Sequence, residues 1–563
     1  MEQMTQPAGA ARRVVLWSVA LASLFLFRLL FGLSNEFFFE DETQIFLMGL
    51  RYYATGAWPY FGADVVWTKS EIPGALQALL VGLPFHVAAI PEAPYVLINV
   101  LSMAAVAGFA WYVTVRLPLP KWLVWGWLMT LPWTIEFSTD IINTSYLLVP
   151  GIAFFIGFFE AVPAFRKATI PEPLAFGLMG AAIAWTVQIH MSWPLLLPYA
   201  GFAWLSSWRG SWRAALRNTA GFVAGAAVFA TLLVPTFLDY GPGGGTGGTI
   251  RNLLPHPISP RIAIDILARL FSFASLEVWR FLATDDAKRV MFLYRHLWIV
   301  PFAVVLWAAS IWQPFWMLRE WFRTASPFPE WRALKWLVAA TVVLVYASYW
   351  FVLEPSQAHA FYIIAPVGLM FAAYCWTFVD SPRWRRVAAV LLTISVVFHI
   401  GLGWLQAPER SLYQKREVVA AAVRLKQPEM FAHRRPFAID GGPTHLEDPS
   451  RPYHDHRDVE FSNPQLTSGP DLFVRWQVPF WNVALWKVTL TNTNPHVAYR
   501  DVLYRTRYHD ARGQLIVERA DYIKDVFQPS AIAALEVNDG FLPRGCATAT
   551  IEVLRAEALL PIP

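Results

Sequence analysis

The run VVLWSVALASLFLFRLLFGL, residues 14–33, is followed shortly by Phe38-Phe39-Glu40-Asp41-Glu42-Thr43. An apolar run of this length is enough to cross the hydrocarbon core of a bilayer as a helix. No small-residue cleavage site follows it and many similar runs come later, so we expect an uncleaved helix that stays in the mature protein. Carboxylates placed directly beyond a membrane span are costly there, and they indicate chemistry at that surface.

The composition of the whole chain agrees with this start. Of 563 residues, 56% are hydrophobic and only 15% are charged, which is typical of a polytopic membrane protein. The net charge of +5 is explained by basic residues on the cytoplasmic side, and the sequence contains no nucleic-acid motif. Cys375 and Cys546 are the two cysteines, so no disulfide framework is available.

Apolar runs predict an α-helical polytopic fold with about eleven transmembrane helices. The expected spans are residues 14–33, 95–115, 122–137, 146–162, 174–188, 193–208, 219–238, 298–317, 336–353, 361–378 and 387–405. The run at 72–85 is short and is bracketed by Pro73 and Pro84, so we expect an interfacial helix there. With that run excluded, the basic clusters between spans all fall on the side of Arg12 and Arg13, which the positive-inside rule assigns to the cytoplasm.

This topology gives a membrane module at 1–406 with two large external loops, at about 34–93 and 239–295. The second loop begins with a glycine run at 241–248, interpreted as a flexible hinge because it lacks the Lys-Ser/Thr ending of a nucleotide-binding loop. An amphipathic helix is expected near 262–273. A surface helix is expected at 411–426, inside a connector at 407–470.

The C-terminal part has a strand pattern. Short apolar runs separated by turn residues occur at 472–476, 485–490, 502–508, 515–517, 531–537 and 547–554. They predict an external β-sandwich at 471–563. The stretch 492–516 looks like the small immunoglobulin-like domains that bacteria append to envelope proteins.

At this point the membrane module resembles a known superfamily. The acidic loop after the first span, the turn Lys69-Ser70-Glu71-Ile72-Pro73 into an apolar helix, and the row of later spans are similar to GT-C glycosyltransferases. The nearest likeness is to the protein O-mannosyltransferase and aminoarabinose-transferase group of bacteria, in which Lys-Pro-Pro or His-Pro-Pro stands at the Lys69 turn. Three further stretches carry the resemblance, at 142–148, 188–192 and 359–362.

The resemblance implies transfer of a sugar from a polyprenyl-phosphate donor to a hydroxyl on the external face, with inversion at the anomeric carbon. It also implies a multi-pass protein of the bacterial inner membrane with an external C-terminal domain. A hydroxyl acceptor is a weak nucleophile at neutral pH, so a carboxylate must take its proton. Asp41 is the expected base, with Glu42 beside it in the catalytic pair. The competing reading makes both acids a cap and first-turn charge of an interfacial helix.

The growing charge on the leaving phosphate needs cations. Candidate substrate-binding residues are Lys69, Arg51 and Arg28, with Glu71 orienting Lys69, and His190, His359 and Tyr362 at outer helix ends. Each has a plain alternative, because Lys69 and Arg28 could snorkel and the histidines could be hydrogen-bonded interfacial residues. Arg251, Arg261 and Arg280 of the second loop could clamp the phosphate or simply be solvated.

Metal dependence stays open. Asp41, Glu42 and Glu71 could hold a divalent cation through oxygen ligands, and the superfamily has members with and without a metal. His454-Asp455-His456 with His445 is better explained as a solvated loop than as a metal site.

Two other functions compete with sugar transfer. A transporter or lipid flippase would predict an internal repeat and ionisable residues near the bilayer midplane, and an envelope polysaccharide polymerase or ligase would predict a large external loop late in the chain. The transporter pattern is not found, and the acidic loop of this chain comes first, so transfer of a single sugar is favoured. The acceptor could be a lipid, a glycan or a protein.

Overall fold

The computed structural model describes residues 8–35, 39–65, 70–241, 259–283, 286–351, 358–409, 416–428, 458–469, 483–523, 525–543 and 545–559. The chain divides into two compact units. The first contains residues 1–278 and 301–428 with a short piece at 438–444, and the second contains 279–300, 429–437 and 445–563.

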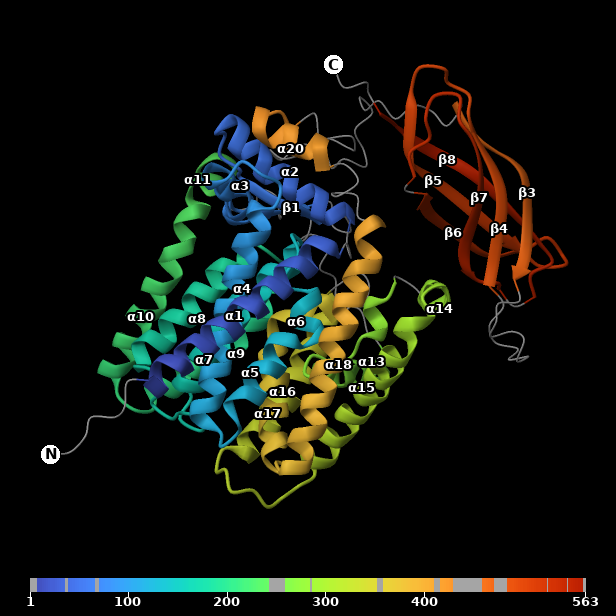
Figure 1. The fold of residues 1–563 in the computed structure, drawn as a ribbon. Coiled ribbons are helices and arrows are strands. Elements are labelled where there is room, and N and C mark those ends of the chain that lie inside the picture. Colours follow the sequence, from blue (N-terminus) through green and yellow to red (C-terminus); the bar gives the residue numbers. More distant parts are fainter. Residues whose placement is uncertain are drawn as a thin grey trace. The chain divides into compact units, whose positions relative to one another are not determined.

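The first unit is a bundle of apolar helices (Figure 1). Among the described residues, seven helices are long and apolar enough to cross a membrane, and they identify a membrane protein. They are Val15–Ser34, Ala93–Arg116, Asn143–Ala161, Trp212–Tyr240, Leu297–Trp321, Trp331–Phe351 and Pro382–Gln406. Helical residues lie in all eleven predicted ranges, but the remaining four helices are shorter, so the count of eleven spans stays a prediction.

The sequence shows why one of the shorter elements is broken. Helix α5 (Lys121–Thr130) ends before Leu131, and α6 (Pro132–Glu136) begins at the following proline. Leu131 is extended, with φ −62° and ψ 131°, because the residue before a proline is disfavoured in the helical region. The predicted span at 122–137 is therefore two helices with a bend between them.

Close packing in the bundle depends on glycine. Helices α8 (Glu172–Val187) and α10 (Trp212–Ala230) approach so closely that a Cβ on Gly225 would lie 1.9 Å from the carbonyl oxygen of Gly177. A Cβ on Gly221 would lie 2.3 Å from the carbonyl oxygen of Pro173. Gly221 and Gly225 are four positions apart, which is the small-residue spacing that lets helices associate in a membrane.

The segment predicted to be the first external loop contains more regular secondary structure than the sequence indicates. It contains α2 (Phe39–Thr55), a hairpin of β1 (Phe61–Val65) and β2 (Ser70–Pro73), and α3 (Leu76–Val87), which corresponds to the predicted interfacial helix. Helices α2 and α3 cross at two glycines, and a Cβ on Gly82 would lie 2.5 Å from the carbonyl oxygen of Gly49. Helix α2 is therefore fixed against α3 by direct backbone contact.

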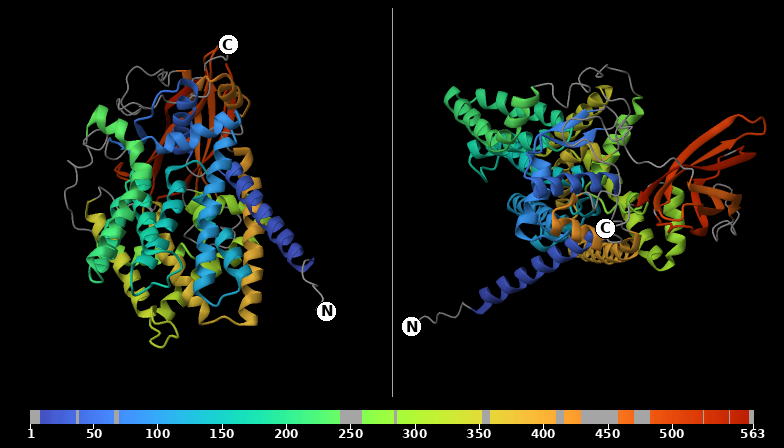
Figure 2. Two further views of the ribbon diagram at one scale, coloured as in Figure 1. Left: turned by 90° about the vertical axis from the view of Figure 1, so that its left-hand side faces the viewer. Right: turned by 90° about the horizontal axis from the view of Figure 1, so that it is seen from above.

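The remaining helices of this unit are α4 (Ala93–Arg116), α7 (Leu148–Ala161), α9 (Leu197–Trp208), α11 (Val234–Tyr240), α13 (Arg261–Ser272), α15 (Val300–Trp321), α16 (Trp331–Ser348), α17 (Ala365–Thr377) and α18 (Pro382–Gln406), preceded by α1 (Ala8–Ser34). Helix α13 is the amphipathic helix expected in the second loop, and it packs on α16 and α17. Figure 2 shows the bundle from two further directions.

A short helix after the last span belongs to the first unit. It is α20 (Arg416–Leu425), within the predicted surface helix, and it buries Val419, Ala422 and Val423. Arg416 pairs with Glu92 at 2.9 Å, and the Lys426 ammonium lies 4.7 Å from the centre of the Tyr53 ring of α2. After the last long helix, the chain is thus attached to α2 and to Glu92 just before α4.

The second unit contains two antiparallel three-stranded sheets. Their strand orders are β3-β4-β7 and β6-β5-β8. The strands are β3 (Val459–Gly469), β4 (Val483–Asn492), β5 (Ala498–His509), β6 (Leu515–Ile523), β7 (Ile532–Phe541) and β8 (Thr548–Leu559). Side chains of both sheets share two apolar clusters, one around Trp486 and Tyr508 and one around Leu490 and Tyr499.

This unit begins earlier than expected. Strand β3 lies inside the predicted connector. The sequence pattern missed it because the strand is irregular: Asn463 has φ 51°, Pro464 follows, and the pairing register shifts between Ser462 and Gln465. Such a bulge interrupts the two-residue alternation that marks a strand in a sequence. The unit also includes α14 (Asp286–Arg295), which contacts β7. The predicted strand at 472–476 and the glycine run at 242–248 lie outside the described residues.

Candidate functional site

The two expected catalytic acids lie in the first turn of α2, where the sequence also allowed a purely structural role. Asp41 is exposed, whereas Glu42 is 5% exposed and accepts a short hydrogen bond from the Tyr95 hydroxyl of α4. A helix N-terminus favours negative charge, so both side chains lie where the helix dipole is favourable to a carboxylate. The two acids differ in burial, and Glu42 is held by the bundle through Tyr95.

A further buried acid, Asp140, interacts electrostatically with the same tyrosine as Glu42. Asp140 is wholly buried in the turn after α6, where its Oδ1 accepts the backbone N–H of Ile141 at 2.7 Å. Tyr146 is also wholly buried, and both Asp140 and Glu42 are near enough to act on it electrostatically. Within the described chain the Tyr146 hydroxyl has no hydrogen-bond partner. Acidic groups from α2 and from the turn after α6 therefore converge on one tyrosine.

Another carboxyl group lies beside this cluster. Glu136, the last residue of α6, is wholly buried, and its Oε2 accepts a 2.8 Å hydrogen bond from the Asn35 side chain at the end of α1. Asn99 of α4 donates to the carbonyl oxygens of Tyr95 at 2.9 Å and Thr139 at 3.0 Å. The ends of α1, α4 and α6 are joined here by polar side chains without access to water.

The structure corrects the two roles weighed for Arg28. Its side chain is wholly buried, and its Nη atoms donate to the carbonyl oxygens of Met129 and Thr134 and to the hydroxyls of Thr134 and Ser138. Snorkelling would expose the guanidinium, and a phosphate contact would require these acceptors to be released. Arg28 instead fixes α1 to the bend between α5 and α6, where the broken helix leaves carbonyl groups to be satisfied.

His190 lies at the same end of the bundle as the first loop. It follows α8, is half-buried, and its Nδ1 accepts the backbone N–H of Ser192 at 3.1 Å. The neighbouring Gln188 packs against Gly74, which directly follows β2 and has a φ of 109°. Thr236 of α11 donates to the carbonyl oxygen of Tyr60 at 2.7 Å. Residues at the ends of α8 and α11 therefore support the hairpin of β1 and β2.

The other predicted binding residues differ in their burial and in their distance from Asp41 along the chain. Arg51 is half-buried on α2, ten residues beyond Asp41, which is about 15 Å along a helix axis. Glu71 is 5% exposed on β2, opposite Asp64 in the hairpin. Lys69, Arg251 and the side chain of His359 lie outside the described residues, and Arg261 is exposed at the start of α13.

Tyr362 is a packing residue, which corrects its assignment to the substrate site. It is 1% exposed, its hydroxyl donates to the Trp133 carbonyl oxygen at 3.0 Å, and its ring stacks on Trp133 at 6.1 Å. The ring of Phe273 meets it edge-on at 5.6 Å. All faces of this side chain are thus engaged by α6, the end of α13 and its own helix.

Within the part of the chain that the structure describes, no group of three or more His, Cys, Asp or Glu side chains is arranged to hold a metal ion. Glu42 and Glu71 are buried while Asp41 is exposed, so these three acids do not share an open face. The histidines at 445, 454 and 456 lie outside the described residues.

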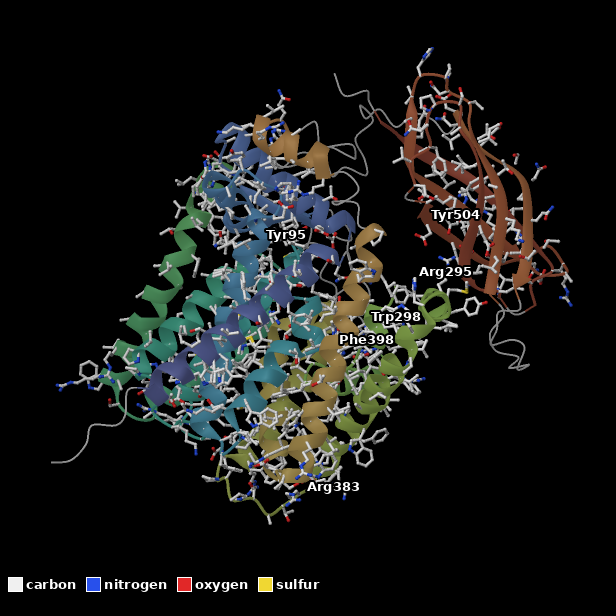
Figure 3. The ribbon with its side chains drawn as sticks, viewed as in Figure 1. Tyr95, Arg295, Trp298, Arg383, Phe398 and Tyr504 are labelled. Carbon is white, nitrogen blue, oxygen red and sulfur yellow. The ribbon has the colours of Figure 1, made fainter. Side chains whose placement is uncertain are left out.

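The opposite end of the first unit carries basic residues in ion pairs. Arg116 and Glu160 form a buried pair at 2.8 Å, and Lys167 pairs with Glu330 at 2.9 Å. Desolvation opposes ionisation of Glu330, but hydrogen bonds from Tyr374 and Lys167 outweigh it and lower the pKa of this carboxyl group. Tyr95 and Arg383 mark the two ends in Figure 3. The acidic site and the basic loops therefore lie at opposite ends of the bundle.

Sequence reasoning missed Asp140, Glu136, Asn35 and Tyr95. A signal for the first two was present, because ionisable residues inside an apolar stretch are rare and usually functional. Asn35 and Tyr95 carried no such signal, since polar residues near helix ends are common. Their place in the site follows only from the packing of α1 and α4.

The fold and the site define a polytopic membrane protein with a cluster of carboxylates at one end of its helix bundle. No family model and no curated protein matches the sequence. Among solved structures the chain is similar to the arabinosyltransferase EmbB from Mycobacterium smegmatis, with 12% identity and a TM-score of 0.38. The alignment covers 99% of this chain and 64% of that one, so the chain spans less than two thirds of its neighbour's length. A TM-score of this size does not establish a common fold or activity.

Proposed function

We propose that the protein is a membrane glycosyltransferase of the GT-C type, acting on the external face of a bacterial inner membrane. The observation that carries the proposal is the first turn of α2, where an exposed carboxylate, Asp41, adjoins a buried one, Glu42, at one end of an apolar bundle. A membrane-bound donor would reach such a carboxylate from the lipid phase. An acceptor would reach it from water.

In the proposed reaction a polyprenyl-phosphate sugar meets an acceptor hydroxyl at Asp41. The hydroxyl oxygen forms a bond to C1 of the sugar on the face opposite the phosphate, while the bond from C1 to the phosphate oxygen breaks. The hydroxyl proton goes to Asp41, and polyprenyl phosphate leaves with the bonding electron pair, so the anomeric configuration inverts. Glu42 supports Asp41 by adding negative charge beside it and by anchoring the turn to Tyr95.

The leaving phosphate requires a cation near Asp41. Arg51 is about 15 Å away along α2, so Lys69 is the proposed partner of the phosphate and Arg51 a more distant contact. Glu71, His190 and His359 are proposed contacts of the sugar or the acceptor. Whether the reaction requires a divalent cation at the carboxylates is tested by adding a chelator in the assay below. The two-sheet unit, proposed as an external β-sandwich, would recruit a lipid, glycan or protein acceptor, or stabilise the enzyme.

The test is release of polyprenyl phosphate from a panel of polyprenyl-phosphate sugars by purified protein in nanodiscs, with and without a chelator. Asp41→Asn should abolish release while folding normally, and Asp239→Asn, at an exposed acid on α11, serves as the matched control. Equal release by Asp41→Asn and wild type would remove Asp41 as the base. No release with any donor would contradict the transferase proposal.

A transporter or lipid flippase is the second candidate. Arg28, Glu136 and Asp140 are buried charged or ionisable groups in an apolar bundle, and the helix at 122–137 is broken, both of which are features of membrane transport sites. Translocation of a fluorescent polyprenyl-phosphate analogue across proteoliposomes, without its hydrolysis or transfer, would favour this function. An envelope polymerase would instead extend a glycan product by many sugars in the same assay.

A further inference from the structure

The buried stretch from Thr134 to Asp140 is unusually polar for the interior of an apolar bundle. Thr134, Glu136, Ser138, Thr139 and Asp140 are each 1% exposed or less. Burying a polar group costs free energy unless the group is hydrogen-bonded. The hydrogen-bond partners of these residues therefore show which elements the stretch connects.

Three contacts connect this stretch to one face of α1. Arg28 donates to Thr134 and Ser138, the backbone of Gly32 touches the Thr139 carbonyl oxygen closely enough that a Cβ would lie 2.1 Å from it, and Asn35 donates to Glu136. Positions 28, 32 and 35 are separated by four and three residues, so they lie on the same side of the helix. The stretch therefore fixes α1 along its last two turns.

The contact between Asn35 and Glu136 is the outermost of the three. Among the described residues, Asn35 is the hydrogen-bond partner of Glu136 Oε2, and Glu136 Oε1 is buried without one. A neutral amide does not compensate a full negative charge, and a charged carboxylate in this apolar setting would be very costly. A protonated carboxyl group accepts the same hydrogen bond at much lower cost.

Asn35 is also the last described residue before the chain turns into α2. Asp41 follows six positions later, and the next residue, Glu42, is held from the other side by Tyr95. Two buried hydrogen bonds therefore flank the first turn of α2 in the sequence. One joins Asn35 to Glu136 of α6, and the other joins Glu42 to Tyr95 of α4. Loss of either would let the exposed carboxylate of Asp41 move relative to the bundle.

We infer that Glu136 is a positioning residue for Asp41, which in its neutral form holds Asn35 and thereby the entry to α2. The inference rests on the proposed function, in which Asp41 is the base. Displacement of a reacting group by about 1 Å can lower a rate about 100-fold. Glu136 and Asn35 therefore affect the rate of transfer without touching the substrate.

The experiment compares Glu136→Leu, Asn35→Ala, the double variant and Glu136→Gln with wild type. Glu136→Leu and Asn35→Ala should each lower kcat about 10- to 100-fold with the donor KM unchanged, and the double variant should be no worse than the poorer single one. Glu136→Gln should keep kcat within about threefold of wild type with an unshifted pH profile, since an amide oxygen accepts the same hydrogen bond.

Thr341→Val is the matched control, because it removes a buried hydrogen bond between Thr341 and Tyr199 elsewhere in the bundle, where the two hydroxyl oxygens are 2.6 Å apart. It should lower the unfolding temperature as much as Asn35→Ala while keeping kcat. Equal kcat losses in Thr341→Val and Asn35→Ala would overturn the inference, as would a Glu136→Gln variant as slow as Glu136→Leu.

Hydrogen exchange of the α2 amides, measured without any donor, separates this inference from the proposed function. Faster exchange at residues 42–50 in Glu136→Leu and Asn35→Ala supports the positioning role even if no donor is turned over. Unchanged exchange there would overturn it even if Asp41 proves to be the base.

Discussion

At the residue scale, the buried charged groups of the bundle have different tasks that burial alone does not distinguish. Arg28 and Asp140 are both wholly buried, yet the guanidinium donates to four protein acceptors whereas Asp140 lies with Glu42 near Tyr146. The partners of each group decide its task. This distinction leads to different predictions for Arg28 and for Tyr95, the hydrogen-bond partner of Glu42.

Arg28→Met should destabilise the protein without weakening donor binding. It removes the donors of buried carbonyl and hydroxyl oxygens, and each unsatisfied buried acceptor costs about 1–3 kcal/mol. Thermal unfolding in nanodiscs measures the loss, with the exposed Arg209→Met as the control. A raised donor KM at unchanged stability would instead restore Arg28 as a phosphate contact.

Tyr95→Phe should slow the proposed reaction about tenfold or more. The change removes a hydroxyl that donates to Glu42 next to Asp41, and a buried carboxylate that loses a donor is destabilised in its charged form. Turnover of the polyprenyl-phosphate sugar measures the effect. Tyr52→Phe, at a half-buried tyrosine of α2, the helix that carries Glu42, should leave turnover unchanged. Equal losses of turnover in both variants would mean that the loss does not depend on the hydrogen bond to Glu42.

At the element scale, the segment from α2 to α3 is held in place by several neighbouring elements. Helix α2 is held by α3 at the Gly49 and Gly82 crossing, and by α20 through Lys426 and Tyr53. The hairpin is held by the ends of α8 and α11. A catalytic group on such a supported segment keeps its geometry better than one on a free loop.

Gly82→Ala should reduce both stability and turnover. The added methyl group would lie 2.5 Å from the Gly49 carbonyl oxygen, so α2 and α3 must separate and the first turn of α2 must shift. Gly108→Ala in α4 is the control, because nothing lies within 4 Å of its added Cβ and alanine favours a helix by about 1 kcal/mol over glycine. Equal unfolding temperatures for the two variants would show that the crossing is not tight.

At the scale of the whole molecule, the first unit separates its charges between two ends. The buried acids Glu42, Glu136 and Asp140 belong to the end marked by Tyr95 in Figure 3. The Arg116–Glu160 and Lys167–Glu330 pairs belong to the other end, which Arg383 marks. The pair of Lys167 and Glu330 joins the chain after α7 to the start of α16. It provides a test of stability against pH that does not involve the proposed site.

Wild type should lose stability in acid more steeply than Glu330→Gln. The folded state lowers the pKa of Glu330 below the ordinary value of 4.5, so its contribution is present above that pH and is lost as pH falls through the lowered pKa. At pH 7 Glu330→Gln should unfold at a lower temperature than wild type, because its free energy of unfolding is lower by about 1–2 kcal/mol. The two unfolding temperatures should converge as pH falls from 5 to 3, with Asp239→Asn as the control. A constant difference would exclude the ion pair as the cause.

Much of the architecture could be predicted locally. Apolar runs of twenty residues find helices because a bilayer accepts little else, and five of the six predicted strand runs fall on strands because alternation follows from the pleat. Errors arose where a local signal was interrupted. Leu131 before Pro132 split a span into two helices, and Asn463-Pro464 hid a strand by a bulge.

The sequence by itself determined that this is a membrane protein with an acidic loop after its first span, because hydropathy and the placement of charge are local properties of the chain. Only the tertiary structure decided that Arg28 and Tyr362 are structural, that Asp140 and Glu42 act on the same tyrosine, and that Asn35 binds Glu136. Each of these relations brings together residues separated by about a hundred positions or more. They arise from close approach of helices at glycines such as Gly32, and the hydrogen-bond requirement of buried polar groups then selects the partners.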